Sequence, residues 1–290
     1  MGIETSLFFA FAAAICWGVG DFLIQKSVRK IGTVEALAAI GMIGSVILLP
    51  FVWHDIPQLF SPGNGILLLS LGIVTFAAAV LNFESYRIGK LSVVEVVLEL
   101  ELPITILLGI LLFNETLSSV QVAIILIGFI GILLMSTKTM RLLTNHKNWL
   151  EKGAIIAAMG ALGMGIVNFL TAAASRSISP LMAIWAPWVI FTIVCLFALH
   201  RQNKIRPFIH LLHKHHALII LMGVMDTFAW LFFAFALEGK ELSITTAITE
   251  SYPAIAIGLA VIFNKETIKR HQWIGAFLAI GGSIALAFFI

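Results

Sequence analysis

Ten apolar stretches separated by short polar turns dominate this sequence of 290 residues. A helix needs roughly 20 residues to cross the hydrocarbon core of a bilayer, and each stretch has about that length. Only 11% of the residues are charged, whereas soluble domains average about 25%. We therefore expect an all-α polytopic membrane protein with ten transmembrane helices. The predicted spans are 5–25, 34–53, 65–86, 92–112, 118–136, 153–173, 180–199, 217–237, 243–263 and 272–290.

The basic residues are divided unevenly between the two sides of this predicted topology. Sixteen of the 18 Lys and Arg residues fall in loops that follow odd-numbered spans, and Arg176 and Lys240 fall on the other side. Cytoplasmic loops of membrane proteins carry an excess of positive charge. We therefore expect a multi-pass protein of the cell membrane (plasma or inner) with both termini on the extracytoplasmic side. Because the charges are scattered over short loops, no nucleic-acid partner is expected.

The second half of the sequence repeats features of the first at an offset of about 150 residues: Pro103 recurs as Pro253, and the segment around Asp21 recurs around Asn168. We expect two five-helix repeats, residues 1–137 and 153–290, joined by a cytoplasmic linker at 138–152. An odd number of spans in each half gives the two repeats opposite orientations in the membrane. Inverted repeats with a substrate site near the midplane are common in secondary transporters.

Three further features complete a pattern: the Trp17-Gly18 pair in the first span, a proline in the fourth and in the ninth, and a Glu-Thr turn after each of those two spans. The turns are Asn114-Glu115-Thr116 and Lys265-Glu266-Thr267. Over nearly the whole chain this pattern resembles the EamA family of the drug/metabolite transporter (DMT) superfamily. The resemblance implies a cavity lined by helices one, three, four, six, eight and nine, with helices five and ten at the periphery. It does not define a substrate, because that family moves amino acids, drugs, sugars and other metabolites. Many relatives carry their positive charge on the side of the termini, and this chain reverses that, so the direction of transport stays open.

The fourth span contains three glutamates, Glu95, Glu99 and Glu101, followed by Pro103. A carboxylate in the middle of a membrane helix costs about 2.5–3.5 kcal/mol on insertion scales. Glu95 and Glu99 are one helical turn apart on one face, and we expect them to bind substrate and to couple transport to protons. Glu101 points away from them and is expected to make a structural contact. For each carboxylate, a hydrogen bond to a neighbouring helix is the alternative role.

Other polar and aromatic residues inside the predicted spans are candidates for the same substrate site. Asp21 lies one turn beyond Trp17, and Asp226 one turn before Trp230. By the repeat offset, Thr245 and Thr249 correspond to Glu95 and Glu99, so one half supplies charge where the other supplies neutral hydrogen-bonding groups. The remaining predicted substrate-binding residues are Asn82, Glu250, Trp185 and Trp188. Asp21 could instead cap its helix, Trp185 and Trp188 could pack against lipid, and Glu84 could pair with Arg87 or Arg29.

An acidic site in a dry environment favours cations, and aromatic faces add about 0.5–2 kcal/mol each through cation–π contacts. We therefore predict a secondary active transporter that works by alternating access on a small organic cation or amine-bearing metabolite. Two neighbouring carboxyl groups can share one proton, which makes proton coupling or exchange plausible. The alternatives are an amino-acid or drug exporter of the same fold with a neutral or zwitterionic substrate and, more remotely, a membrane transferase or a channel.

Apart from a small-molecule substrate and membrane lipid, we expect no partner and no cofactor, and the protein is expected to be a monomer or a homodimer. One further motif is the run His210–His216, which contains four histidines. It offers an i,i+3 pair, but neither a cysteine nor a carboxylate accompanies it. We expect a solvated, amphipathic connection there and no metal site.

Overall fold

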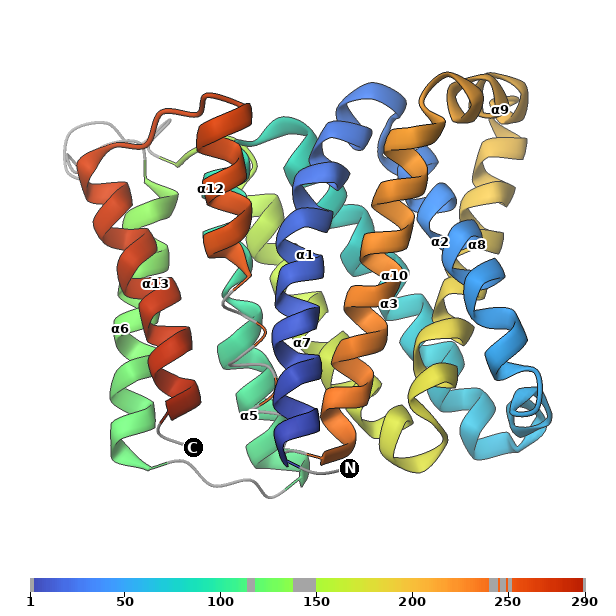
Figure 1. Cartoon of the computed structure of the whole chain (residues 1–290), viewed down its shortest axis with the longest axis horizontal. Coiled ribbons are helices and arrows are strands. Elements are labelled where there is room, and N and C mark those ends of the chain that lie inside the picture. Colours follow the sequence, from blue (N-terminus) through green and yellow to red (C-terminus); the bar gives the residue numbers. More distant parts are fainter. Residues whose placement is uncertain are drawn as a thin grey trace.

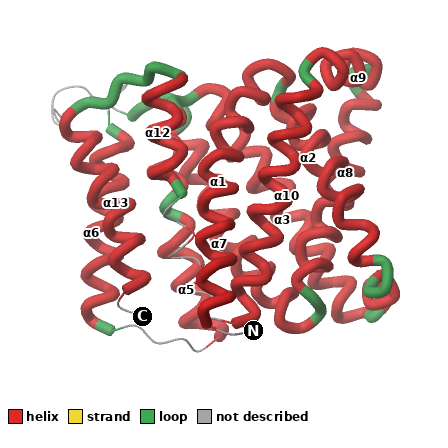
Figure 2. The backbone as a smooth tube through the Cα atoms, in the orientation of Figure 1, coloured by secondary structure: helices red, strands yellow, loops and turns green. Residues whose placement is uncertain are grey.

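The computed structural model describes residues 3–113, 118–137, 150–239, 245, 249 and 252–288. The described part is helical except for loops and one isolated bridge between Thr137 and Leu150 (Figure 2). Its helices, labelled in Figure 1 where there is room, are α1 (Ile3–Ile31), α2 (Thr33–Val52), the 3-10 helix η1 (Ile56–Phe60), α3 (Pro62–Ile88), α4 (Leu91–Leu98), α5 (Glu101–Phe113), α6 (Ser119–Ser136), α7 (Ala154–Ser177), α8 (Pro180–Arg201), α9 (Ile205–Lys214), α10 (His216–Gly239), α12 (Pro253–Phe263) and α13 (Arg270–Phe288).

Eight helical segments in the described part of the chain are long and apolar enough to cross a membrane, and α12 is a shorter apolar helix. Helices α4 and α5 count together as one of the eight segments. Helix α13 stands in the place of the tenth predicted span, whereas much of the ninth, 243–263, lies outside the described residues, as does most of the predicted linker. The protein is therefore an all-helical multi-pass membrane protein, but the predicted count of ten membrane helices is not confirmed.

Equivalent helices of the two halves make equivalent contacts, so the main contacts between helices have counterparts with the halves interchanged. Helix α1 packs along α10, and its counterpart α7 packs along α3; likewise α12 contacts α1, and α5 contacts α7. Helices α2 and α8 pair with each other, as do α6 and α13. In Figure 1, α6 and α13 form one edge of the bundle, which is the peripheral position that the family resemblance implied. Helix α1 begins and α13 ends at the same face of the bundle.

The fourth predicted span is interrupted in its middle, between α4 and α5. Pro103 has no N–H group to donate to the carbonyl of Glu99, one turn earlier. The Leu102 N–H donates to that carbonyl instead, at 3.1 Å, and the Leu100 N–H donates to the Val97 carbonyl at 3.2 Å. This three-residue spacing is tighter than that of an α-helix. As a result, the regular rotation of 100° per residue does not continue from Glu95 to Glu101.

Two glycines allow α6 and α13 to cross with their backbones in contact. A Cβ atom on Gly131 would lie 2.5 Å from the backbone nitrogen of Ala279 and 2.6 Å from the carbonyl oxygen of Gly275. A Cβ atom on Gly275 would lie 2.6 Å from the carbonyl oxygen of Gly131. Small residues at a crossing are a common way for membrane helices to approach closely. Because α6 and α13 come from different halves, this crossing joins the two repeats at the edge of the bundle.

Candidate functional site

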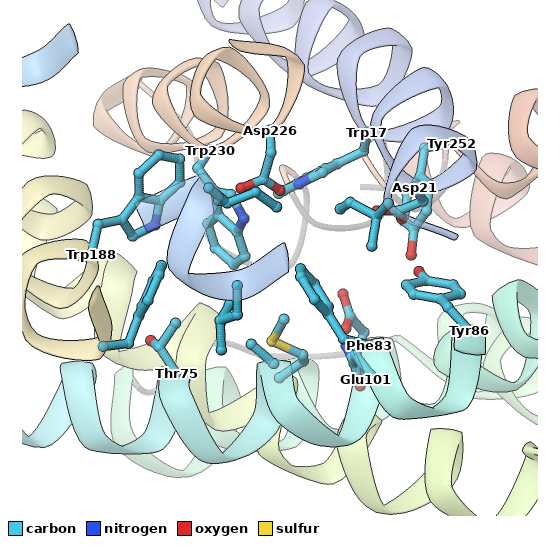
Figure 3. Close-up of a pocket in the computed structure, with 17 residues that line it drawn as sticks. Trp17, Asp21, Thr75, Phe83, Tyr86, Glu101, Trp188, Asp226, Trp230 and Tyr252 are labelled. Atoms are coloured by element: carbon cyan, nitrogen blue, oxygen red, sulfur yellow. The ribbon is translucent and has the colours of Figure 1, made fainter. Parts of the chain in front are cut away.

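A cavity of about 60 Å³, called here the central cavity, lies between the two halves (Figure 3). Three carboxylates line it: Asp21 from α1, Glu101 from the start of α5, and Asp226 from α10. None of the described residues that line it is a lysine, an arginine or a histidine. The other side chains on which the site is built are Trp17, Thr75, Asn82, Phe83, Tyr86, Trp188, Phe191, Trp230 and Tyr252.

The helices around the central cavity include two that the family resemblance did not imply. Besides α1, α3, α5, α7, α10 and the start of α12, the wall contains residues from α2 and α8. Helix α8 reaches the cavity with Trp188, whose ring fills the space where a side chain on Gly44 of α2 would be. Trp185 points elsewhere: its indole N–H donates to the Ser45 carbonyl at 3.0 Å, and it does not line the cavity.

The carboxylates of the central cavity act on one another electrostatically. The charges of Asp226 and Glu101 both bear on Asp21, and the Tyr86 hydroxyl approaches Asp21. In Figure 3 the Asp226 carboxylate points toward the indole of Trp17, and Asp21 lies beside the two tyrosines. The fold thus brings two predicted helical pairs together at one cavity: Asp21 with Trp17, and Asp226 with Trp230.

Glu101 is held at the cavity by helix α7. Its Oε1 atom accepts a hydrogen bond from Asn168 Nδ2 at 3.4 Å, and Asn168 also donates to Thr105 Oγ1 at 3.3 Å. The expected structural contact of Glu101 is therefore present, but the side chain also lines the cavity. A carboxylate that bonds to a neighbouring helix and faces a cavity is available to a ligand as well.

Gly165 and Gly18 are equivalent glycines of the two repeats, and their contacts can be compared at the site. A Cβ atom on Gly165 would lie 2.5 Å from Ile104 Cγ2 and 3.1 Å from the Glu101 carbonyl oxygen. A Cβ atom on Gly18 would lie 2.6 Å from Ile255 Cβ and 2.9 Å from the Tyr252 carbonyl oxygen. The backbone carbonyls of Glu101 and Tyr252 thus approach corresponding glycines in the two halves. One half places a carboxylate at the cavity, and the other half places a phenol there.

The chain contains two tyrosines in all, Tyr86 and Tyr252, and both line the central cavity. Both hydroxyls also approach Glu95, which is fully buried behind them and does not line the cavity. Neither oxygen of Glu95 has a hydrogen-bond partner at ordinary distance and angle among the described residues. Neither tyrosine was among the predicted site residues. The signal for them is their rarity: the chain has two tyrosines and 22 phenylalanines, and the hydroxyl of a buried tyrosine usually has a polar partner.

Glu95 and Glu99, the predicted substrate and proton pair, do not lie at the same cavity. Glu99 follows the last residue of α4 and lines a separate cavity of about 20 Å³ with Pro103 and residues of α6 and α13. The two carboxylates still influence each other electrostatically. Their expected roles in substrate binding and proton coupling remain predictions, whereas Glu101 takes the position at the central cavity.

An aromatic wall extends across the two halves beside the carboxylates. The rings of Trp17 and Trp230 meet edge to face, with centroids 5.1 Å apart and planes at 87°. Trp17 also contacts Tyr252, with ring centroids 5.9 Å apart. Edge-to-face pairs fix the rings in place. The cavity therefore combines negative charge with ordered aromatic surfaces.

The remaining predicted site residues have different surroundings. Asn82 lines the cavity, where Asn82 Oδ1 and Thr75 Oγ1 are buried without a hydrogen-bond partner among the described residues. Thr245 and Thr249 are buried but do not line the cavity. Glu250 lies outside the described residues.

Glu84 has the alternative role that the sequence left open for it. Its Oε1 atom forms an ion pair with Arg87 Nη2 at 2.5 Å, and its Oε2 atom accepts a hydrogen bond from Thr33 Oγ1 at 2.9 Å. Glu84 does not line the central cavity. Its ion pair is partly exposed near the end of α3.

A second polar cluster connects the halves at the face of the bundle opposite the start of α1. The Glu266 carboxylate accepts hydrogen bonds from the backbone N–H groups of Leu91 and Ser92, both at 3.0 Å, and from Ser92 Oγ at 2.7 Å. Lys90 Nζ donates to the Thr267 carbonyl at 3.4 Å. A carboxylate is favourable at the N-terminus of a helix, where N–H groups lack partners within the helix. We call the contact of Glu266 with Leu91 and Ser92 the latch.

Comparison with known proteins agrees with this architecture. A solved structure described only as "Crystal structure of protein" is similar with a TM-score of 0.70 and 14% sequence identity, covering 99% of this chain and 97% of that chain. Likeness at this low identity shows the fold alone. No curated protein matches the sequence. The model of the EamA-like transporter family matches twice, over residues 4–137 and 151–288. These two matches take in nearly the whole chain, which therefore belongs to the EamA-like transporter family.

Proposed function

We propose that this protein is a secondary transporter that carries a small organic cation or amine-bearing metabolite through the central cavity by alternating access. One observation carries the proposal: the described residues that line the cavity include three carboxylates, Asp21, Glu101 and Asp226, and no basic side chain. Like charges gathered in a poorly hydrated site are costly. A bound cation offsets this negative charge.

The aromatic wall supports the same substrate class. A cation over the face of a tryptophan or tyrosine gains about 0.5–2 kcal/mol, with the larger value for a desolvated site. Trp17 offers such a ring, and the rings of Trp230 and Tyr252 each contact it. Thr75 Oγ1 and Asn82 Oδ1 are buried without a partner among the described residues, and we propose that they accept hydrogen bonds from the substrate once the site opens. An ammonium group with an attached polar group matches this set of partners.

A zwitterionic substrate, the main alternative, fits the cavity less well. An amino acid would place its own carboxylate near Asp21, Glu101 or Asp226, and the described lining residues offer it no basic partner. A transferase would need a reactive cluster at the membrane interface, whereas this polar cluster is enclosed between the halves.

The size of the cavity supports a change of conformation during the cycle. Sites for drug-sized ligands occupy roughly 300–1,000 Å³, whereas the central cavity measures about 60 Å³. The described conformation is therefore contracted around the site, and a ligand enters after the helices separate. The latch joins the halves at one face, so we propose that it breaks when that face opens. Basic residues such as Arg29, Arg201 and Lys269 end or begin helices at this face, which we propose is the cytoplasmic one.

Protons are the available countercharges when no cation is bound. If the substrate displaces a proton, substrate transport is coupled to proton movement, because both cations compete for the same negative charge. We propose Asp21, Glu101 and Asp226 as the groups at which they compete, with Glu95 linked to them through Tyr86. Glu99, which lines the smaller cavity, stays a candidate for proton coupling alone.

The test compares how matched cationic and neutral ligands bind to the purified protein. The pairs are choline with its uncharged carbon analogue 3,3-dimethyl-1-butanol, and benzylamine with benzyl alcohol. Thermal stabilisation at pH 6 and pH 8 is measured for the wild type, for Asp226→Asn and for Glu84→Gln, a control that changes a carboxylate outside the cavity. We expect the cations alone to stabilise the wild type, more strongly at pH 8, and at least tenfold higher concentrations to be needed in Asp226→Asn. Equal stabilisation by the neutral analogues would refute the cation proposal. Counterflow of a labelled hit in proteoliposomes then tests transport.

A further inference from the structure

A short helix, α9, lies across the end of the bundle at the face that carries the latch (Figure 1). It connects α8 to α10 and is amphipathic: Phe208 is buried, whereas Arg206, His210 and His213 are exposed. The expectation of an amphipathic connection is therefore confirmed, and the connection is helical. Basic amphipathic helices at the end of a membrane bundle are suited to the lipid–water interface.

Positive charge accumulates around α9 without acidic partners. The stretch 152–225 contains no aspartate or glutamate at all. In the described residues, Arg201, Lys204, Arg206 and Lys214 form no ion pair with a carboxylate. Partial burial, and then the charges of Lys30 and Lys214, lower the pKa of His215. The neighbouring helix α2 contributes one carboxylate, Glu35, in its first turn. Around α9, basic side chains therefore outnumber acidic ones among the described residues.

An apolar groove of about 280 Å³ runs from this basic end along the outer surface, between α2, α9 and α10. Its walls are formed by Ala39, Met42, Ile43, Leu212, Ile219 and Ile220, and two histidines, His213 and His216, close its end. Ile220 is 54% exposed. A groove with apolar walls and imidazoles at one end has the polarity of a phospholipid, whose acyl chain is apolar and whose headgroup is polar.

The two histidines are oriented by the backbone. His213 Nδ1 lies 2.9 Å from the Ile209 carbonyl oxygen, and His216 Nδ1 lies 3.0 Å from the His213 carbonyl oxygen. A carbonyl can only accept, so each Nδ1 carries the hydrogen. The Nε2 atom of each ring is thereby left for another partner, and it becomes a donor to an anion when the ring is protonated.

We propose that this groove binds an anionic phospholipid, with one acyl chain against α2 and α10 and the phosphate between His213 and His216, next to Lys214. Each Lys or Arg near the membrane surface raises the affinity for negative phospholipids about fivefold, which is equivalent to about 1 kcal/mol. The apolar wall distinguishes a lipid from a free phosphate, which gains nothing from Ile43 or Ile220. The proposal does not depend on which substrate the transporter carries.

The experiment measures thermal unfolding of the full-length protein in detergent with added phosphatidylglycerol, phosphatidylcholine, or glycerol phosphate as the soluble headgroup. The variants are His213→Gln/His216→Gln, in which glutamine can still donate to the carbonyls, and Lys214→Gln. Arg270→Gln is the matched control, because Arg270 is an exposed basic residue at the same face but begins α13, at the other edge of the bundle. Unfolding without lipid shows whether each variant is folded as well as the wild type.

We expect phosphatidylglycerol to raise the melting temperature of the wild type and of Arg270→Gln more than phosphatidylcholine does. The concentration needed for half of this shift should rise about fivefold in Lys214→Gln and more in the double histidine variant, while glycerol phosphate has no effect. Equal shifts with the two lipids would overturn the proposal, as would an undiminished phosphatidylglycerol shift in the histidine variant. A full shift with glycerol phosphate would assign the histidines to a soluble anion and would also overturn it.

Discussion

The substitution Glu266→Gln tests whether the latch holds one face of the transporter closed. In the structure, the two carboxylate oxygens accept three hydrogen bonds from Leu91 and Ser92 across the boundary between the halves. Glutamine is nearly the same size, but it keeps one acceptor oxygen and no charge. The variant therefore weakens the contact with little change in volume.

The size of the effect follows from the type of bond that is lost. Hydrogen bonds to charged groups contribute about 1.5–3 kcal/mol, and those between neutral groups about 0.5–1.5 kcal/mol. Interaction of the charge with the N-terminus of α4 adds about 0.3–1 kcal/mol. Because Glu266 is partly exposed, we take the lower part of this range, about 1–2 kcal/mol. The ratio of open to closed molecules should then rise about fivefold to thirtyfold.

Distance measurement between two spin labels can follow this change. The labels are placed at Ile88, at the end of α3, and at Arg270, at the start of α13, on either side of the latch, after Cys16 and Cys195 have been replaced by alanine. We expect Glu266→Gln to increase a population with a longer distance between the labels. Glu35→Gln is the control, because it removes a carboxylate from the first turn of α2 and not from the contact between the halves.

An unchanged distance distribution in Glu266→Gln would refute the reasoning, provided that the protein remains folded. If the variant melts at a lower temperature while the distances stay as in the wild type, Glu266 is a cap for α4 in every conformation. The latch would then have no part in opening.

Three further predictions concern packing and the site. Asn168→Ala should lower the free energy of unfolding by about 1–3 kcal/mol, because Glu101 and Thr105 lose a buried donor; chemical denaturation in detergent measures it, and an unchanged midpoint would contradict it. Gly131→Ala should lower the free energy of unfolding by about 1–3 kcal/mol through overpacking at the helix crossing. Gly281→Ala should lower it little, because an added Cβ there meets nothing within 4 Å. Equal melting temperatures of the two variants would contradict this prediction. Tyr86→Phe removes the hydroxyl that approaches Asp21 and should weaken choline binding severalfold, as measured by titration calorimetry; unaltered affinity would exclude Tyr86 from the site.

Much of the architecture could be predicted from the periodic placement of apolar residues. Because a bilayer fixes the length of a spanning helix, the apolar stretches located α1–α3, α6–α8 and α10 closely. The repeat between the segments of Asp21 and Asn168 indicated that the halves correspond, and the pairs Asp21–Trp17 and Asp226–Trp230 reach the cavity because each lies on one regular helix.

The fourth span could be predicted only in part, because spacing along one helix does not say which face meets the cavity. The helix is interrupted at Glu99 and Leu100. Glu99 and Glu101 point in different directions, as their spacing predicts, but Glu101 faces the central cavity and Glu99 faces α6 and α13. The role of Tyr252 depends on a contact between distant segments, its approach to Gly18, which spacing along one helix does not reveal.

The crossing of Gly131 and Gly275 limits how the two repeats can move. No layer of side chains separates the two backbones at that point, so the helices have nothing to slide over and cannot approach further. Tilting about the point where they touch is the motion left to them, and it works against the hydrogen bonds that Gln272 of α13 donates to the carbonyls of Met135 and Thr137. The edge of the bundle is therefore suited to act as a pivot, with the central cavity and the latch at a distance from it, so that a small tilt there becomes a larger displacement where the substrate passes.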